Sequence, residues 1–261
     1  MSDLQGIERS SLFSYSVQYF WYKKQKVLLD IVRKYLRSVQ KKVYQICDIG
    51  CEIGHDVFKI YDIFKNKYSL FFTGIDINEK AIEIANARSN FNDRNPIKFV
   101  FYCFDIEKGL PIQNYYDIII ITELIEHLKE PEKIFNEIIR ILSDDGIVIL
   151  STPNTENMSL LLLKKIGLKK IFNFDDYKQF HSQVGYDHIS LFNEKELKRI
   201  IDKYNLKIIE KKRITFFYGN KLLDENPILF AFYLILDNIF DKIKILNSFS
   251  YSNFYVIKKR W

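Results

Sequence analysis

The residues best suited to do chemistry are two glutamates and a histidine in the run Glu123-Leu-Ile-Glu126-His127. On a helix, residues at positions i, i+3 and i+4 lie on one face, so we expect the two carboxylates and the imidazole to converge. Oxygen and nitrogen ligands of this kind can bind a divalent ion such as Mg²⁺ or Mn²⁺. His188 is a candidate fourth ligand. The hypothesis is a metal site formed by Glu123, Glu126, His127 and His188; the alternative is a metal-free cluster with local hydrogen bonds.

A glycine-containing turn after an apolar run indicates that a cofactor binds near residues 43–54. Gly50 and Gly54 bracket the turn, and Asp48 comes just before it. Glycine is needed there because a Cβ atom would block a tight turn and the close approach of a ligand to the backbone. The middle position is Glu52, whose carboxylate suits a ligand with an ammonium and a sulfonium better than a pyrophosphate.

The elements around these residues alternate between strand-like and helix-like patterns, which predicts an α/β fold with a mostly parallel sheet. A capping box at Asn193 and Glu196 marks the start of one helix. The predicted strands are 43–49, 70–75, 97–104, 116–121, 147–151, 206–214 and 252–258, with a turn at 143–146. The predicted helices are 14–37, 55–65, 78–88, 131–142, 194–204 and 227–246.

The motif D-x-G-x-E-x-G resembles the first motif of class I S-adenosylmethionine (SAM)-dependent methyltransferases, [DE]-x-G-x-G-x-G. The succession of elements over residues 43–154 also resembles that family's core in order and spacing. The resemblance implies a doubly wound, Rossmann-like, seven-stranded sheet that binds SAM, with Asp76 at the ribose and Asp105 at the adenine amino group. The cofactor-binding residues that it implies are Asp48, Gly50, Cys51, Glu52, Gly54, Asp76, Ile77, Asp105, Ile106 and Thr122.

The E-x-x-E-H element resembles that of ubiquinone-pathway O-methyltransferases (methyltransferase type 11-like) and of small-RNA 3′-terminal 2′-O-methyltransferases. In the latter, a D-H-x-x-x-aromatic segment supplies a further metal-binding histidine, and Asp187-His188 with Phe192 matches this pattern. The resemblance implies catalytic roles for Glu123, His127 and His188. A metal ion or one of the histidines would then promote loss of the acceptor's proton.

The elements divide the chain into four predicted parts. Residues 1–42 form a helical N-terminal extension, and 43–154 form the SAM-binding core. Residues 155–190 form an insertion that is long for a connection, which is typical of a lid over a site. Residues 191–261 complete the core and include a helical cap at 227–246, for which packing, a dimer face and a membrane surface are alternatives.

The composition favours a cytoplasmic enzyme. The chain has 261 residues, 48% of them hydrophobic, and its longest pure apolar run, 228–236, is too short to span a bilayer. We expect its three cysteines, Cys47, Cys51 and Cys103, to be reduced core residues. The net charge of +6 is modest and its lysine pairs are scattered, which indicates a solvated surface more than a nucleic-acid patch.

The first interpretation is therefore SAM-dependent O-methylation of a small molecule, a glycan or a lipid-linked intermediate. One alternative is an RNA 2′-O-methyltransferase with a divalent metal, and another is a SAM-binding assembly subunit without catalysis. We expect a monomer or a homodimer, with peripheral membrane contact as an option. The sequence does not specify the methyl acceptor.

Overall fold

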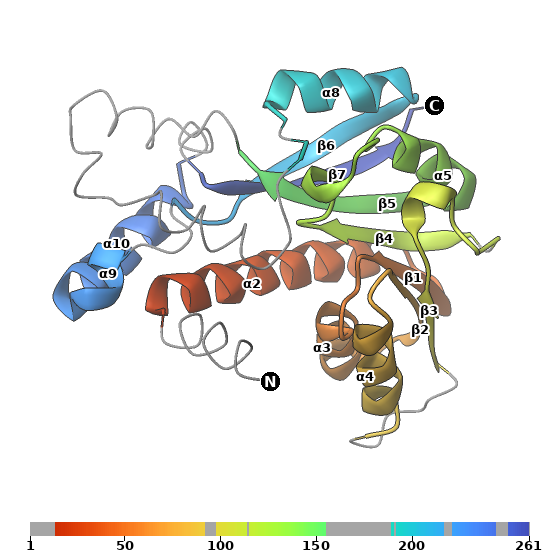
Figure 1. The fold of residues 1–261 in the computed structure, drawn as a ribbon, viewed down its shortest axis with the longest axis horizontal. Coiled ribbons are helices and arrows are strands. Elements are labelled where there is room, and N and C mark those ends of the chain that lie inside the picture. Colours follow the sequence, from red (N-terminus) through yellow and green to blue (C-terminus); the bar gives the residue numbers. More distant parts are fainter. Residues whose placement is uncertain are drawn as a thin grey trace.

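A computed structural model describes residues 14–91, 98–113, 115–154, 189–190, 192–216, 221–243 and 250–260. Seven strands form one sheet in the order β3-β2-β1-β4-β5-β7-β6 (Figure 1). All neighbours are parallel except β7, which is antiparallel to β5 and β6. This confirms the predicted doubly wound sheet. The strands are β1 (Val43–Ile49), β2 (Ser69–Asp76), β3 (Phe99–Cys103), β4 (Tyr116–Thr122), β5 (Leu142–Pro153), β6 (Leu206–Arg213) and β7 (Ser252–Lys259).

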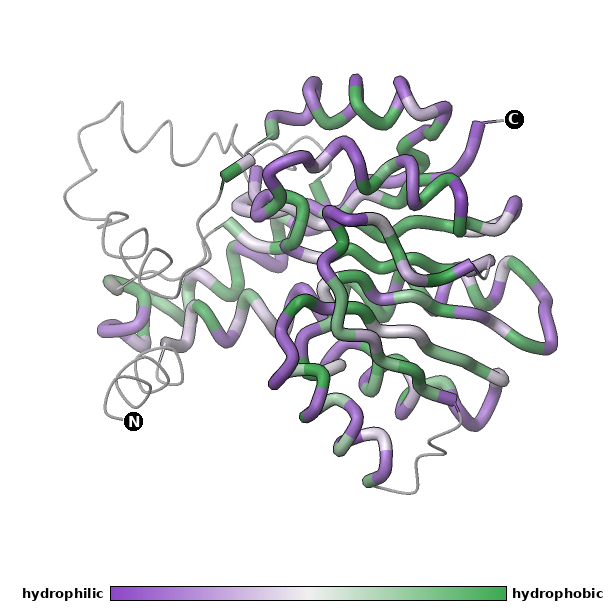
Figure 2. The backbone as a smooth tube through the Cα atoms, turned by 45° about the vertical axis from the view of Figure 1, so that its right-hand side comes forward, coloured by the Kyte–Doolittle hydropathy of each residue, from purple (hydrophilic) through white to green (hydrophobic). Residues whose placement is uncertain are grey.

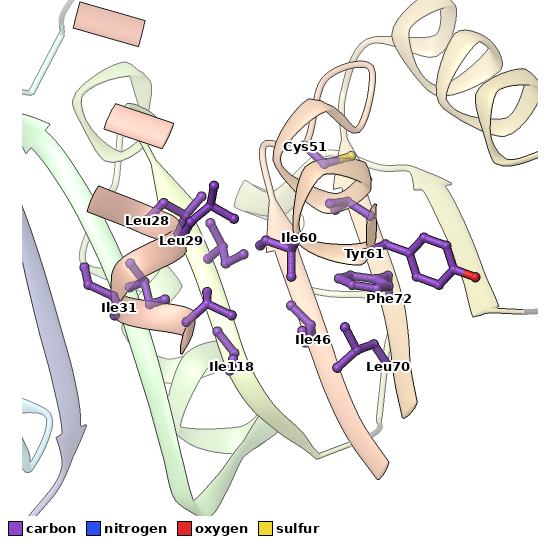
Figure 3. Packing of buried hydrophobic residues seen from close by; sticks show 14 of the residues in the cluster. Leu28, Leu29, Ile31, Ile46, Cys51, Ile60, Tyr61, Leu70, Phe72 and Ile118 are labelled. Atoms are coloured by element: carbon purple, nitrogen blue, oxygen red, sulfur yellow. The ribbon is translucent and has the colours of Figure 1, made fainter. Parts of the chain in front are cut away.

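Helices cover both faces of the sheet because its central strands are apolar on both sides. One buried cluster joins α2 (Tyr15–Ser38), α3 (His55–Phe64) and α4 (Glu79–Ser89) to residues such as Ile46 and Ile118 (Figure 3). The other joins α5 (Lys133–Ile141) and α8 (Glu194–Lys203) to the neighbouring strand residues, such as Cys47 and Ile119. The hydrophobic strands accordingly run through the centre of the fold (Figure 2).

Local signals in the sequence set the helix starts. The Ser14 hydroxyl accepts a hydrogen bond from the backbone of Val17, and Asn78 caps α4 in the same way. At α8, Asn193 and Glu196 form the reciprocal capping box that the sequence predicts. The remaining described helices are the short η2 (Ile106–Lys108) and η3 (Ile125–His127), α9 (Lys221–Glu225) and α10 (Pro227–Phe240).

Three local predictions are wrong. The helix predicted from 131 begins at Lys133, and the turn predicted at 143–146 lies within β5, where four residues bulge between two pairings with β4. Cys103 is exposed, whereas Cys47 and Cys51 are buried as expected, because β3 is an edge strand of the sheet. Most of the predicted lid (155–190) and the end of the predicted cap (244–246) lie outside the described residues.

Candidate active site

A cavity of about 690 Å³ opens at the carboxyl ends of β1, β2 and β4. This is where the sheet order reverses direction, the point at which open α/β sheets bind their ligands. Every predicted cofactor residue except Gly54 lines it, together with Glu123, Glu126 and His127. The remaining lining residues are Phe20, Trp21, Lys24, Gln25, Ile53, His55, Asp56, Ile75, Phe104, Glu107, Leu124, Leu128 and Tyr251.

The glycine turn is held against the end of β2. The backbone N–H groups of Gly50 and Cys51 donate to the carbonyl of Ile75 at 2.8 and 3.1 Å. Gly50 has φ +80° and Gly54 has φ +72°, conformations that glycine adopts without strain. Glu52 also has a positive φ, +46°, which costs energy for a residue with a side chain and explains why related motifs carry glycine there.

Acidic side chains at the ends of neighbouring strands line the cavity. Asp76 accepts hydrogen bonds from the backbone N–H groups of Glu52 (2.8 Å) and Asn78 (2.9 Å), which fixes its carboxylate. Asp105 accepts one from the backbone of Glu107 at 3.1 Å and forms an ion pair with Lys108. The backbone thus presents both carboxylates in set positions at adjacent strand ends.

The cavity is strongly acidic, with one lysine among the described residues that line it. Lys24 is buried, lies 3.6 Å from Asp56 and stands over the Trp21 ring at 4.7 Å. Burial raises the pKa of the Asp48 carboxyl, the Asp56 charge raises it further, and Lys24 acts in the opposite sense. The carboxylate residues that line the cavity are Asp48, Glu52, Asp56, Asp76, Asp105, Glu107, Glu123 and Glu126.

The prediction that Glu123, Glu126 and His127 share one helical turn is wrong. Helix η3 begins only at Ile125, and Glu123 has φ +51°, outside helical geometry. All three residues nevertheless line the same cavity. The Glu123 carboxylate accepts hydrogen bonds from the hydroxyls of Ser151 (2.7 Å) and Ser252 (2.8 Å).

Glu126 is fully buried next to Glu123. Its Oε2 accepts a hydrogen bond from Thr152 at 3.2 Å, while Oε1 has no hydrogen-bond partner among the described residues. Burial raises the pKa of the Glu126 carboxyl well above 4.5, and repulsion from Glu123 adds to this effect. The backbone N–H groups of Ile189 and Ser190 donate to the Glu126 carbonyl at 2.8 and 2.9 Å, so the described end of the predicted lid reaches this cluster.

Three of the four hypothesised metal ligands are described, and they do not form a metal site by themselves. Among the described residues, no three His, Cys, Asp or Glu side chains are arranged to hold an ion. The fourth ligand, His188, lies outside the described residues. A site that requires all four residues therefore stays a prediction.

Helix α2 supplies the lining residues that the motif analysis missed. Phe20, Trp21, Lys24 and Gln25 come from it, and the Gln25 amide contacts the His55 ring at 2.9 Å. The sequence does carry a signal for this role. An aromatic pair and two lysines break the apolar stripe of an N-terminal helix that has no acidic residue before Asp30.

The strand order and the cavity at its switch point define a Rossmann-like, SAM-dependent methyltransferase. The family model described as "Methyltransferase domain" matches residues 20–211, and the chain belongs to this family. The match begins within α2, so this helix is part of the family's shared region.

Relatives and solved structures agree with this assignment. The chain is 26% identical over 189 residues to a ubiquinone biosynthesis O-methyltransferase of Coxiella burnetii, covering 67% of this chain and 77% of that protein. It is 29% identical over 117 residues to a malonyl-[acyl-carrier protein] O-methyltransferase of Bacillus anthracis, covering 45% and 40% of the two chains.

Among solved structures, the plantazolicin methyltransferase with S-adenosylhomocysteine (SAH) matches with TM-score 0.61 and 19% identity, over 99% of this chain and 92% of that one. A magnesium protoporphyrin IX methyltransferase from Synechocystis with bound SAH matches with TM-score 0.59 and 16% identity, over 93% and 86%. At these identities the likeness concerns the fold. No described helix is long and apolar enough to cross a membrane.

Proposed function

We propose that this methyltransferase transfers the methyl group of SAM to a hydroxyl or carboxyl oxygen of a small molecule. The observation that carries the proposal is a single cavity in which the acidic cofactor end meets Glu123 and His127. The named activities of the Coxiella and Bacillus relatives, both O-methyltransferases, support the choice of oxygen.

The cofactor end of the cavity suits the charges of SAM. Asp76, fixed by two backbone N–H groups, retains lone pairs for the ribose hydroxyls, and Asp105 faces the adenine amino group. The sulfonium and the α-ammonium lie among the cavity's carboxylates, where positive charge is stabilised. Lys24 then pairs with the α-carboxylate, the one anionic group of the ligand.

The transfer is an in-line displacement at the methyl carbon. A lone pair on the acceptor oxygen forms the new C–O bond while the C–S bond breaks, and SAH leaves as a neutral thioether. The protein contributes chiefly by holding the two reactants in line and excluding water. For a hydroxyl acceptor, the imidazole of His127 takes the proton. Glu123, oriented by Ser151 and Ser252, stabilises the imidazolium.

A metal is not required by this scheme, and no step is assigned to one. The four-residue hypothesis has its own test. If Glu123, Glu126, His127 and His188 hold Mg²⁺ or Mn²⁺, exhaustive chelation abolishes turnover and the added ion restores it, while SAM affinity stays nearly unchanged. Turnover that survives chelation leaves His127 as the base.

The experiment that tests the proposal follows methyl-tritiated SAM into fractions of a cell extract. We expect label in the small-molecule and lipid fraction, bound through oxygen. Label in RNA would instead support the RNA alternative, and SAM binding without any transfer would support the assembly subunit. The variant His127→Ala should lose about 100-fold or more in turnover and keep its SAM affinity. Full activity in this variant would contradict the role of His127.

A further inference from the structure

We propose that Glu107 is a positioning residue for the methyl transfer. Its side chain holds the loop that follows His127, and so keeps the imidazole in place within the cavity. Glu107 belongs to η2, comes two residues after Asp105, and is half-buried where it lines the cavity. The role rests on the proposed function, because it requires His127 to act on the acceptor. It connects the adenine end of the cavity with the acceptor end.

The Glu107 carboxylate binds two backbone N–H groups of the loop between η3 and α5. Its Oε1 atom accepts hydrogen bonds from the N–H of Lys129 at 2.8 Å and from that of Glu130 at 3.0 Å. A charged acceptor forms stronger hydrogen bonds than a neutral one. Strand β4 separates these residues from Glu107 in the chain. The two bonds therefore fix the start of this loop relative to η2.

Glu107 is itself held from both sides along the chain. Its backbone N–H donates to Oδ1 of Asp105 at 3.1 Å. The loop that continues from η2 is attached to α5, because the N–H of Leu110 donates to Glu137 at 3.0 Å and Arg140 donates to the Leu110 carbonyl at 3.2 Å. The Glu107 side chain thus extends from an anchored segment of backbone.

His127 lies between two points of attachment. The carbonyl of Glu126 accepts a hydrogen bond from the N–H of Ser190 at 2.9 Å, and the Ser190 hydroxyl donates to the carbonyl of Leu128 at 2.8 Å. The bonds to Glu107 follow at the next two residues. A displacement of about 1 Å in a reacting group can cost about 100-fold in rate, so attachment on this side bears on turnover.

Two substitutions separate the hydrogen bonds of Glu107 from its charge. Glu107→Ala removes the acceptor of both N–H groups. Glu107→Gln removes the charge and keeps an oxygen with two lone pairs, which can accept both bonds. Neither substitution alters the backbone N–H that binds Asp105. We therefore expect the affinity for SAM to stay nearly unchanged in both variants.

The rate is measured as transfer of label from methyl-tritiated SAM to the small-molecule and lipid fraction of a cell extract. At saturating SAM, Glu107→Ala should be roughly tenfold slower than the unaltered protein. Glu107→Gln should restore most of the rate. The control is Glu132→Ala, which removes a half-exposed carboxylate that pairs with Lys203. It should transfer label at the unaltered rate.

Amide hydrogen exchange tests the contact without any acceptor. Exchange at Lys129 and Glu130 in the SAM-bound protein should become faster in Glu107→Ala, because both N–H groups lose their partner. In Glu107→Gln and in the control it should stay close to that of the unaltered protein. Calorimetry with SAM on the same samples shows whether each variant is folded.

The proposal is overturned if exchange at the two amides is unchanged in Glu107→Ala, or if Glu107→Gln loses as much rate as Glu107→Ala. It is also overturned if SAM affinity falls in parallel with the rate, because Glu107 would then be a ligand of the cofactor. A full rate in Glu107→Ala together with a loss in His127→Ala contradicts the positioning role alone. A full rate in His127→Ala contradicts the proposed function.

Discussion

At the scale of single residues, Asp76 makes the clearest case for cofactor binding. Its carboxylate is fixed by two backbone N–H groups and faces the cavity. We expect Asp76→Ala to weaken SAM binding at least tenfold, about 1.4 kcal/mol, as measured by calorimetry. The control is Asp62→Ala, a surface acid on α3. Unchanged affinity in a folded Asp76 variant would refute the assignment.

Lys24 provides a sharper test of the cofactor's position, because it is proposed to pair with a single group of SAM, the α-carboxylate. The variant Lys24→Met should weaken binding of SAH by roughly tenfold, about 1.4 kcal/mol. Binding of 5′-methylthioadenosine, which lacks the α-carboxylate, should change little. Lys26→Met, an exposed lysine on the same helix, is the control. Equal losses for both ligands would show that Lys24 supports the cavity's structure instead.

Asp48 should make the stability of the ligand-free protein depend on pH. Its folded-state pKa is raised above the ordinary value of 3.8, first by burial and then by Asp56. The folded state therefore holds the proton more tightly, and stability is lost as pH rises from that ordinary value toward the raised pKa. Asp48→Asn removes this loss. Its gain in melting temperature over the unaltered protein should be small near about pH 4 and grow toward about pH 8. A gain that is the same at every pH would contradict this account.

The cavity residues that the sequence predicted differ from those that it missed in what determines their position. Asp48, Gly50 and Asp76 lie at strand ends, where backbone pattern alone determines position. Lys24 reaches the cavity only through the packing of α2 across the sheet, which no local pattern specifies. Glu123 was expected on a helix, but its backbone is left-handed and its side chain is held by two serines from β5 and β7.

At the scale of elements, a cluster of ion pairs holds α2, β6 and α10 together: Lys23 and Arg213 both pair with Asp237 and Asp241. Asp237→Asn would leave Lys23 and Arg213 buried with less compensation. We expect a loss of about 3 kcal/mol in the free energy of unfolding, measured with denaturant. Asp62→Asn breaks an exposed pair with Lys65 and should cost no more than about 0.5 kcal/mol. A similar small loss in both variants would show that the cluster contributes little to the free energy of unfolding.

Most of the elements could be predicted, and the errors have local causes. The strand and helix cores followed from apolar spacing, and the cap at Asn193 followed from side-chain chemistry. The bulge in β5 could not be predicted, because the turn-forming residues at 143–146 lie between two pairings of β5 with β4 and do not end the strand. The ion-pair cluster joins residues about 200 positions apart, beyond the reach of any sequence window.

At the scale of the whole molecule, cofactor binding should stabilise the fold, because the cavity joins α2 to three strand ends. With SAM at about 100 times its Kd, linkage gives about 2.7 kcal/mol. For a chain of this size we expect the melting temperature to rise by roughly 5–10 °C. NAD at the same concentration should give no shift, since the acidic cavity repels a pyrophosphate. A shift with NAD and none with SAM would overturn the assignment of the cavity.

The place of β7 in the sheet has a consequence for how the chain folds as it is synthesised. It lies between β5 and β6, although β6 precedes it in the chain. When β6 leaves the ribosome, it has no strand to pair with, and the edge of β5 is open as well. The pairings on both sides form together once β7 emerges. Until then a nascent chain exposes two unpaired edges, the condition under which molecular chaperones are needed most.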